Sequence, residues 1–374
     1  MSDQTRTIQP EGDPSIVLPS QEREELRGVV ADFVARHASH ESVRESAETD
    51  LGYSRSRWST LAGELGIGAL AVPEDLGGHG FGFADLAVVL EASGAALLPE
   101  PVLASAVVGC QALVLADEAA AVAQLRDEAI AGTVVLAVAL DQDVALDVEA
   151  GRTIARGKVP GVLWGAAADH LVVVGKKDGD TVLALVDLAD VDHAPREGMD
   201  LTRRCADLHL DGAPARVLVG AARADEVLAR LRLIRSAALA SEHAGIAARL
   251  LEMTVEYVTQ RQQFGRQIGS FQAVKHRIAD MLVDRERARA AAGYAMAVLD
   301  SGEAPDTELA VAVAATVCLE AATRSAYEAI QLHGGIGFTW EHSAHFYLRR
   351  VLGDEGAFGS ARRSRRGIAE LVGV

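Results

Sequence analysis

Apolar residues recur at helical spacing through the first third of the chain. From position 21 onward they fall three or four residues apart, which predicts a helix with one buried face: Leu26, Val29, Val30, Phe33 and Val34. The same spacing predicts helices over 58–65, 84–96 and 102–125. A break that contains Pro99 and Pro101 separates the last two, because proline interrupts a helix.

The pattern changes at about Thr133, where short runs rich in β-branched residues replace the helical spacing. Runs over 134–140, 171–174 and 181–186 predict strands. Between the last two, the Asp-Gly pair within 176–180 predicts a hairpin turn. This part of the chain therefore predicts a compact β domain.

Helical spacing returns beyond Arg223 and continues to the end. It predicts one long helix or a close pair, followed by helices over 271–299, 306–333 and 342–372. Long helices with short connections favour an antiparallel bundle. The predicted parts are a flexible leader over 1–19, an N-terminal helical domain over 20–132, a middle β domain over 133–222 and a C-terminal four-helix bundle over 223–374.

The charge balance bears on the class of partner. Lys and Arg number 36 against 53 Asp and Glu, so the net charge is −17, which disfavours nucleic-acid binding. One basic cluster near the C-terminus is best explained as a solvated helical face, with a phosphate site as the alternative: Arg349, Arg350, Arg362, Arg363, Arg365 and Arg366.

Other features indicate a cytoplasmic protein without a metal. The three cysteines, Cys110, Cys205 and Cys318, lack metal-ligand spacing and fit a reducing compartment. The polar start has no signal segment, and the most apolar stretch, 102–116, is too short to cross a membrane.

Two segments of the predicted bundle carry candidate chemistry. Arg261, Phe264, Phe271 and Gln272 lie in a loop interrupted by glycines, and they combine a bidentate cation, two apolar ring faces and an amide. A phosphorylated aromatic cofactor needs such a set. In the second segment, which starts at Gln331, glycines let the backbone approach a ligand: Gly334, Gly335 and Gly337. Each segment alone could be a capped helix–loop–helix, but their co-occurrence favours a binding site.

These residues resemble the acyl-CoA dehydrogenase family. The resemblance rests on three motifs: Arg-x-x-Phe-Gly-x-x-Ile-x-x-Phe-Gln over 261–272, Ala-Asp-Met over 279–281 and Gln-x-x-Gly-Gly-x-Gly-Phe over 331–338. The segment 72–78 is similar to that family's Pro-Glu-x-x-Gly-Gly. The resemblance covers essentially the whole chain and implies a mainly α fold with a central β-barrel-like domain.

The resemblance also implies a cofactor and a reaction. Non-covalent FAD would be shared between subunits of an oligomer. Arg261, Phe264 and Gln272 would hold its pyrophosphate and adenine side, while residues from the partner chain would approach the adenosine diphosphate portion: Gln331, Gly334 and Gly335. Family members remove an α-proton with a carboxylate and pass a β-hydride to the flavin, and an electron-transfer flavoprotein takes the electrons.

The catalytic residues cannot be assigned, because the family's base is missing. Counting without gaps from the Gly334–Gly335 pair places Phe358 where the family has its usual Glu. The family's alternative base position falls on Arg235-Ser236. Glu355 reaches the first position only after a local shift in its helix.

Another carboxylate, Glu242, lies two helical turns beyond the alternative base position. It is best explained as a structural group paired with His243 or Arg249. The flavin-supporting loop of the family is reduced to 139–143, and Trp164 is either a remnant of the Trp-Ile-Thr/Ser strand or a core residue.

Three functions follow from the resemblance. The first is an FAD-dependent acyl-CoA dehydrogenase of a divergent actinobacterial type, acting in steroid or branched-acid catabolism. The second is a non-catalytic subunit that shares FAD within a heteromeric acyl-CoA dehydrogenase. The third, less favoured, is a flavin monooxygenase or oxidase on the same fold.

Overall fold

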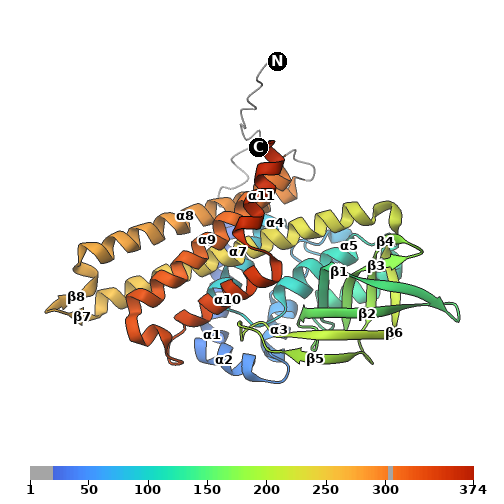
Figure 1. Ribbon diagram of the computed structural model, residues 1–374, viewed down its shortest axis with the longest axis horizontal. Helices are drawn as coiled ribbons and strands as arrows, with labels where there is room; N and C mark the ends of the chain where they lie inside the picture. The colour runs from blue at the N-terminus through green and yellow to red at the C-terminus, as the bar shows by residue number, and fades with distance from the viewer. Residues whose placement is uncertain (1–19, 302–305) are drawn as a thin grey trace, which may run out of the picture.

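The computed structural model describes residues 20–301 and 306–374, so the predicted leader over 1–19 lies outside the described residues. Helices occupy both ends of the chain and a β domain lies between them in sequence (Figure 1). The mainly helical fold with a central β domain, predicted from the sequence, is confirmed.

Two N-terminal helices form where the apolar spacing predicts them, from position 21 and over 84–96. Helix α1 (Gln21–His37) starts at Ser20, whose side chain accepts a hydrogen bond from the Arg23 N–H. Short helices α2 (His40–Glu48) and α3 (Arg55–Ser59) follow, and a π-helical turn, η2 (Thr60–Glu64), continues α3. Helix α4 (Phe83–Ala96) is buried along most of its length.

The single helix predicted over 102–125 is wrong. The segment forms a π-helix η4 (Val102–Gly109), α5 (Cys110–Val114), a 3-10 turn η5 (Ala119–Val122) and α6 (Ala123–Ile130). Asp117 explains the break. Its backbone N–H donates to the Leu218 carbonyl at 2.8 Å, and its carboxylate accepts from the Gly220 N–H and pairs with Arg223. These contacts take the backbone out of helical hydrogen bonding.

The middle domain is a closed sheet of six strands: β1 (Leu136–Glu149), β2 (Arg152–Leu163), β3 (His170–Lys177), β4 (Asp180–Asp187), β5 (Asp192–Arg196) and β6 (Cys205–Val219). Strand order is β2-β1-β3-β4-β6-β5, and β2 also pairs with β6, which closes the barrel. The predicted hairpin turn is confirmed, since Asp178 and Gly179 have φ of +53° and +91°.

The C-terminal part consists of α7 (Ala221–Gln260), α8 (Gln272–Asp300), α9 (Thr307–His333), α10 (Ala344–Phe358) and α11 (Ala361–Val372). A single helix over 342–372 is wrong, because Gly359 adopts φ +111° and Ser360 caps α11. Helix α9 is long and apolar enough to cross a membrane by length and composition alone, but about half of its apolar window is buried against the bundle.

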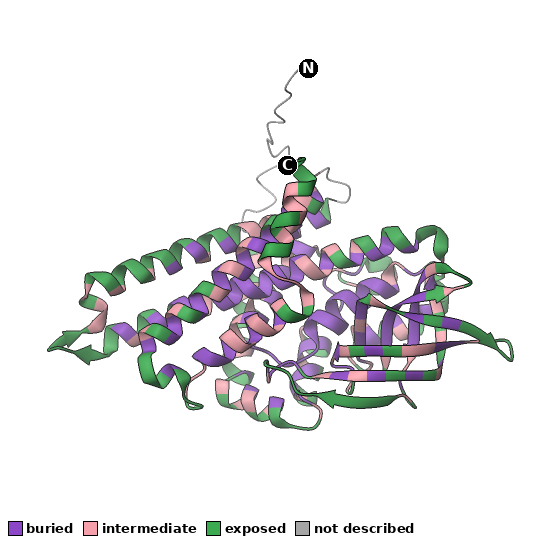
Figure 2. Cartoon of the chain, viewed as in Figure 1, coloured by how far each residue is buried: buried purple, intermediate pink, exposed green. Residues whose placement is uncertain are grey.

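Helix α7 links the bundle to the rest of the molecule. Its middle part is buried almost all round, as Figure 2 shows, because α4, α8 and α9 all pack against it. Gly245 permits the approach of α4: a Cβ there would lie 1.9 Å from the Glu91 carbonyl oxygen. On α4, a Cβ at Gly94 would likewise lie 2.0 Å from the Glu242 carbonyl oxygen of α7. Close packing of α4 and α7 thus fixes the N-terminal domain to the bundle.

Candidate functional site

The first motif forms a compact hairpin between α7 and α8. Strands β7 (Gln262–Gln263) and β8 (Arg266–Gln267) pair, and Phe264 and Gly265 make the turn with φ of +53° and +75°. The Ile268 N–H donates to the Arg261 carbonyl at 2.9 Å and closes the loop before α8 begins. The hairpin forms one end of the molecule (Figure 1).

The predicted ligand-binding side chains of this hairpin face solvent. Phe264 is 92 % exposed, and Arg261 and Gln272 are exposed as well. Within the described part of the chain, the Arg261 guanidinium has no hydrogen bond or ion pair. Phe271 is half-buried, lies edge-on to Phe264 and carries the guanidinium of Arg266 4.0 Å above its ring.

The second motif begins where α9 ends. Gly334 has φ +65°, and the 3-10 turn η7 (Gly334–Phe338) follows. A Cβ at Gly334 or Gly335 would meet no described atom within 4 Å, so the backbone is open to a ligand from outside. Gly337 differs, because a Cβ there would lie 3.1 Å from the Ile330 carbonyl oxygen. Gln331 is exposed beside this turn.

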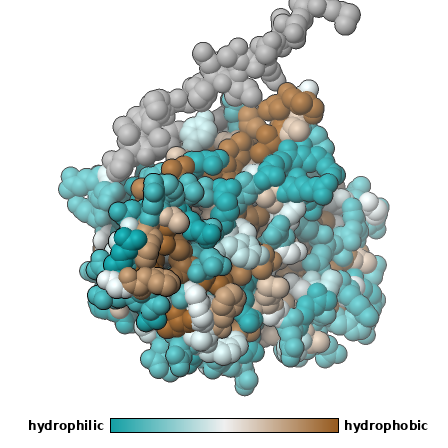
Figure 3. Space-filling view, turned by 60° about the vertical axis from the view of Figure 1, so that its left-hand side comes forward, coloured by the Kyte–Doolittle hydropathy of each residue, from teal (hydrophilic) through white to brown (hydrophobic). Residues whose placement is uncertain are grey.

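One ring contact joins the two motifs. Tyr257 stacks on His333 with ring centroids 4.4 Å apart, and the Tyr257 carbonyl accepts from the Arg261 N–H. The structure therefore brings the hairpin and the glycine turn to the same end of the molecule. Figure 3 turns this end toward the viewer and shows apolar surface among polar surface. Several large apolar side chains are exposed here: Phe264, Ile336, Phe338 and Trp340.

A cavity of about 250 Å³ lies between the barrel, η4 and the end of α10. Phe358 and Arg235 line it, and the resemblance places the usual base at Phe358 and the alternative base at Arg235-Ser236. The Arg235 guanidinium lies over the Phe358 ring, 5.3 Å from its centroid. The two positions therefore converge, but they hold a cation and an apolar ring. Glu355 is half-buried and is not among the lining residues.

Asp141 is the one carboxylate among the described residues that line this cavity. Its Oδ2 pairs with Arg235 Nη1 at 2.7 Å, and its Oδ1 pairs with Arg232 Nε at 3.3 Å. Burial by itself would raise the pKa of Asp141, but the two arginines outweigh it and lower the pKa below its ordinary value. The group is therefore an ionised partner for arginine and a poor proton acceptor.

Glu242 is a structural residue, as expected, but its predicted partners are wrong. The side chain is buried and pairs with Arg203, which also pairs with Asp354. His243 instead lies 3.1 Å from the other oxygen of Asp354, and Arg249 pairs with Glu252. Arg203 comes from the loop before β6, so sequence proximity to Glu242 could not reveal it.

The buried charges around Arg203 connect three parts of the fold. Burial opposes ionisation of Asp354, yet Arg203 and then His243 lower its pKa to about 2. Asp354 lies one helical turn before Phe358, so the network holds the end of α10 against the cavity. Next to it, the Arg350 Nε donates to Asp200 at 2.6 Å, and Arg350 is fully buried.

This burial corrects the interpretation of the basic cluster as a wholly solvated face. Arg350 belongs to the buried network, Arg349 lies over the Trp340 ring and Arg365 pairs with Glu320. The remaining members are exposed on α11: Arg362, Arg363 and Arg366. Trp164 is 2 % exposed, lines the cavity beside Phe358 and donates its indole N–H to the Pro99 carbonyl.

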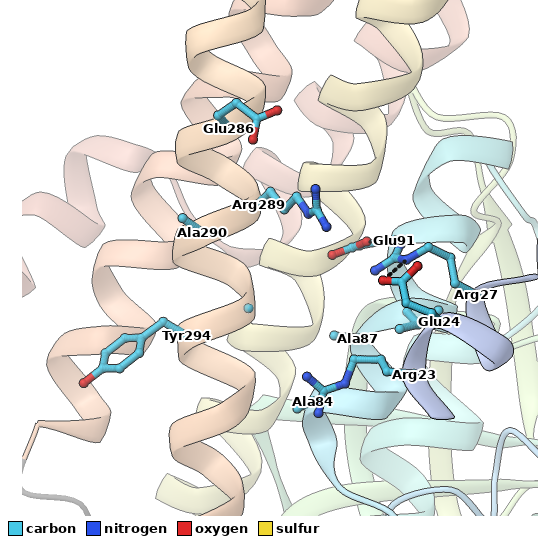
Figure 4. A pocket seen from close by; sticks show the side chains of 12 residues that line it. Arg23, Glu24, Arg27, Ala84, Ala87, Glu91, Glu286, Arg289, Ala290 and Tyr294 are labelled. Carbon is cyan, nitrogen blue, oxygen red and sulfur yellow. Dashed lines mark hydrogen bonds and ion pairs between the residues drawn. The ribbon is translucent and has the colours of Figure 1, made fainter. Parts of the chain in front are cut away.

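A second hollow, of about 350 Å³, opens between α1, α4 and α8 (Figure 4). Its charged groups are mostly engaged, since Arg27 pairs with Glu91 at 2.8 Å and Arg23 with Asp85 at 3.1 Å. None of the predicted site residues is among the described residues that line it. The candidate site therefore consists of the hairpin end and the cavity beside Phe358.

Known proteins show the same organisation. The family description "Acyl-CoA dehydrogenase, C-terminal domain" matches residues 220–373, and "Acyl-CoA dehydrogenase, N-terminal domain" matches residues 20–121. The curated "Acyl-CoA dehydrogenase IpdE2" of Mycobacterium tuberculosis is 37 % identical over 357 residues, which cover 95 % of this chain and 99 % of that protein.

Solved structures agree. One chain of the ChsE4-ChsE5 complex from Mycobacterium tuberculosis superposes with a TM-score of 0.86 at 28 % identity, covering 96 % of this chain and 98 % of that one. A chain of a variant of the Tcur3481-Tcur3483 steroid ACAD gives a TM-score of 0.84 at 27 % identity, with 94 % and 98 % covered. The chain belongs to the acyl-CoA dehydrogenase family.

Proposed function

We propose that this chain acts in the FAD-dependent α,β-dehydrogenation of an acyl-CoA thioester as one subunit of a mixed oligomer, in which an unlike partner chain supplies the carboxylate base. One observation carries the proposal. Phe358 and Arg235 line a single cavity, and the resemblance implies a base at Phe358 and an alternative base at Arg235-Ser236. Neither side chain can accept the α-proton at neutral pH.

The hairpin end fits a shared FAD. The Arg261 guanidinium, which pairs with no described residue, is available for a pyrophosphate, and Phe264 offers an exposed ring face beside it. Gly334 and Gly335 leave backbone accessible to phosphate or ribose oxygens. Gln272 and Gln331 add exposed amides. Bound FAD would supply the hydride acceptor, and this chain's own contribution would be to grip the cofactor.

A mixed oligomer also suits the surface. The hairpin end exposes apolar side chains that a neighbouring subunit would cover, including Phe338 at 71 % and Trp340 at 54 %. Of the two similar structures, one is a complex of two proteins and the other a steroid ACAD. Our proposal therefore includes a steroid-like or other lipid-derived acyl-CoA as substrate, an electron-transfer flavoprotein as electron acceptor and a cytoplasmic location.

The test compares the chain purified alone with the chain co-expressed with a homologue that keeps the family's base. Flavin absorbance is recorded first, and an acyl-CoA is then added without oxygen. We expect the lone chain to contain little flavin. In the assembly, we expect flavin to be bound and the added acyl-CoA to bleach it. Bleaching in the lone chain would instead identify a self-contained dehydrogenase, and reoxidation coupled to oxygen incorporation would identify a monooxygenase.

A pair of arginine variants tests the cofactor assignment within that assembly. Arg261→Ala should lower FAD occupancy at least tenfold, because a charge-assisted contact to phosphate is lost. Arg152→Ala, an exposed arginine on β2, is the matched control and should retain FAD. Equal occupancy in both variants would show that Arg261 does not bind the pyrophosphate.

A further inference from the structure

We propose that the cavity beside Phe358 binds an acyl group that carries its own free carboxylate, and that Arg235 recognises this carboxylate. The inference rests on the proposed function and specifies its substrate class. It departs from what the family resemblance implies, because an arginine takes the place at which the family has a proton acceptor.

The first support is the spare hydrogen-bonding edge of Arg235. The side chain is 13 % exposed, and its Nη1 is engaged with Asp141 at 2.7 Å. Its Nε is buried and has no hydrogen-bond partner among the described residues. A buried unpaired donor is costly, so this edge of Arg235 favours an additional hydrogen-bond acceptor. The Nε edge of a guanidinium matches a carboxylate in the bidentate geometry that arginine favours.

The second support is the local charge. Asp141 carries one negative charge, whereas Arg235 and Arg232 carry one positive charge each, so the cluster keeps a net charge of +1. The other cation of the cavity, Arg196, is neutralised by Asp207 at 3.2 Å. A carboxylate entering beside Arg235 would balance the remaining charge in a partly dehydrated place.

The third support is the composition of the walls. Leu103, Val108 and the Phe358 ring provide apolar surface for hydrocarbon, and β1 contributes two polar residues, Asp141 and Gln142. Gln142 has a buried Oε1 without a partner in the described chain, while its Nε2 donates to the Pro160 carbonyl. A volume of about 250 Å³ is below the roughly 300–1,000 Å³ of drug-sized pockets, so the acyl end fits rather than the whole thioester.

The fourth support is the position of Arg235 in the fold. Arg235 lines the cavity from α7, and its guanidinium lies over the Phe358 ring, 5.3 Å from the ring centroid. Arg232, one turn earlier, contacts the same Asp141 but does not line the cavity. The two arginines thus form a matched pair, of which one alone can reach a ligand.

The experiment measures binding of two thioesters of equal chain length, adipoyl-CoA with a terminal carboxylate and hexanoyl-CoA without one. Titration calorimetry is performed on the purified assembly, and flavin content is recorded in parallel. We expect adipoyl-CoA to bind at least tenfold more tightly. Arg235→Met should abolish the preference, Arg232→Met should retain it, and Arg235→Lys should keep only part of it.

Equal binding of the two thioesters, no binding of either, or an unchanged preference in Arg235→Met would overturn this inference. Arg235→Lys keeps the charge and serves as the test if Arg235→Met does not fold, as judged by its thermal transition. Flavin content separates the two proposals. A flavin-loaded assembly without carboxylate preference refutes the inference alone, whereas an assembly that never holds FAD refutes the proposed function.

Discussion

Arg235 lies over the ring of Phe358, 5.3 Å from its centroid, although the two residues belong to different helices and are 123 positions apart. Each stands where the family resemblance places a proton acceptor. Their contact means that a carboxylate introduced at position 358 would lie beside the Arg235 guanidinium.

Phe358→Glu should therefore produce a weak base at this place. We expect exchange of the α-proton of hexanoyl-CoA with D2O to rise at least tenfold, below the roughly 10²–10⁴-fold of an optimised general base, since Arg235 favours the ionised carboxylate. Phe358→Gln, which has the same length without the charge, should show no gain. If both variants match the parent protein, position 358 does not face the substrate.

Arg203→Met should destabilise the fold strongly, because the buried Glu242 would lose its ion pair and the buried Asp354 would keep only His243. Removing one partner of a buried pair costs about 3–5 kcal/mol. Arg223→Met, which breaks the half-exposed pair with Asp117, should cost only about 0–1 kcal/mol. Denaturant unfolding of both variants checks the difference, and similar losses would mean that the buried network contributes no special stability.

Acid should destabilise the end of the bundle next to the glycine turn. His342 packs 4.3 Å from His333, and burial followed by the neighbouring His333, His40 and His345 lowers its pKa from 6.5 to about 4. The unfolded chain then binds this proton more readily than the folded chain. The contribution of His342 to the free energy of unfolding is therefore complete above about pH 6.5 and is lost as the pH falls towards 4.

Thermal unfolding between pH 7 and pH 4.5 tests this dependence. His342→Gln should reduce the drop in melting temperature, because the amide does not titrate. His276→Gln, at an exposed histidine of α8, is the control and should leave the drop as it was. Identical pH profiles in all three proteins would remove His342 as the origin of acid sensitivity.

Gly245→Ala should push α4 and α7 apart. Its Cβ would lie 1.9 Å from the Glu91 carbonyl oxygen, and backbone atoms cannot move aside as a side chain could. Overpacking typically costs about 1–3 kcal/mol. Gly293→Ala on α8 meets no described atom within 4 Å and should gain about 0.5–1 kcal/mol from helix propensity. Urea denaturation should show opposite signs for the two variants.

Local signals predicted much of the fold. Helical spacing located α1, α4, α8 and α9, and the Asp-Gly pair located the β3–β4 turn. Strand β2 was not predicted, because charged residues and two glycines interrupt its alternation, and its pairing with both β1 and β6 is a property of the closed barrel. Helix α2 was not predicted either, since only Val43 and Ala47 are buried in a mostly polar segment.

In the candidate site, too, the contacts between residues close in sequence could be predicted and the contacts between distant residues could not. The hairpin over 261–272 is built from neighbouring residues, so its sequence pattern indicates it directly. The partner of Glu242 is Arg203, and that of Arg350 is Asp200, 150 positions away, and no local pattern contains such pairings. One signal was present: Glu242 and His243 interrupt an alanine-rich apolar run, which suggests that both are buried and need partners.

The hairpin over 261–272 is built from residues close together in the chain, whereas the cavity beside Phe358 is assembled from the barrel, η4, α7 and α10. The residues that line the cavity are therefore separate from those of the hairpin. After a duplication, a copy of such a protein could lose its reactive carboxylate and still be kept by selection, provided that its sister chain relied on it to retain the coenzyme. Because different residues form the two regions, related subunits can evolve so that one retains the coenzyme and the other provides the reactive carboxylate.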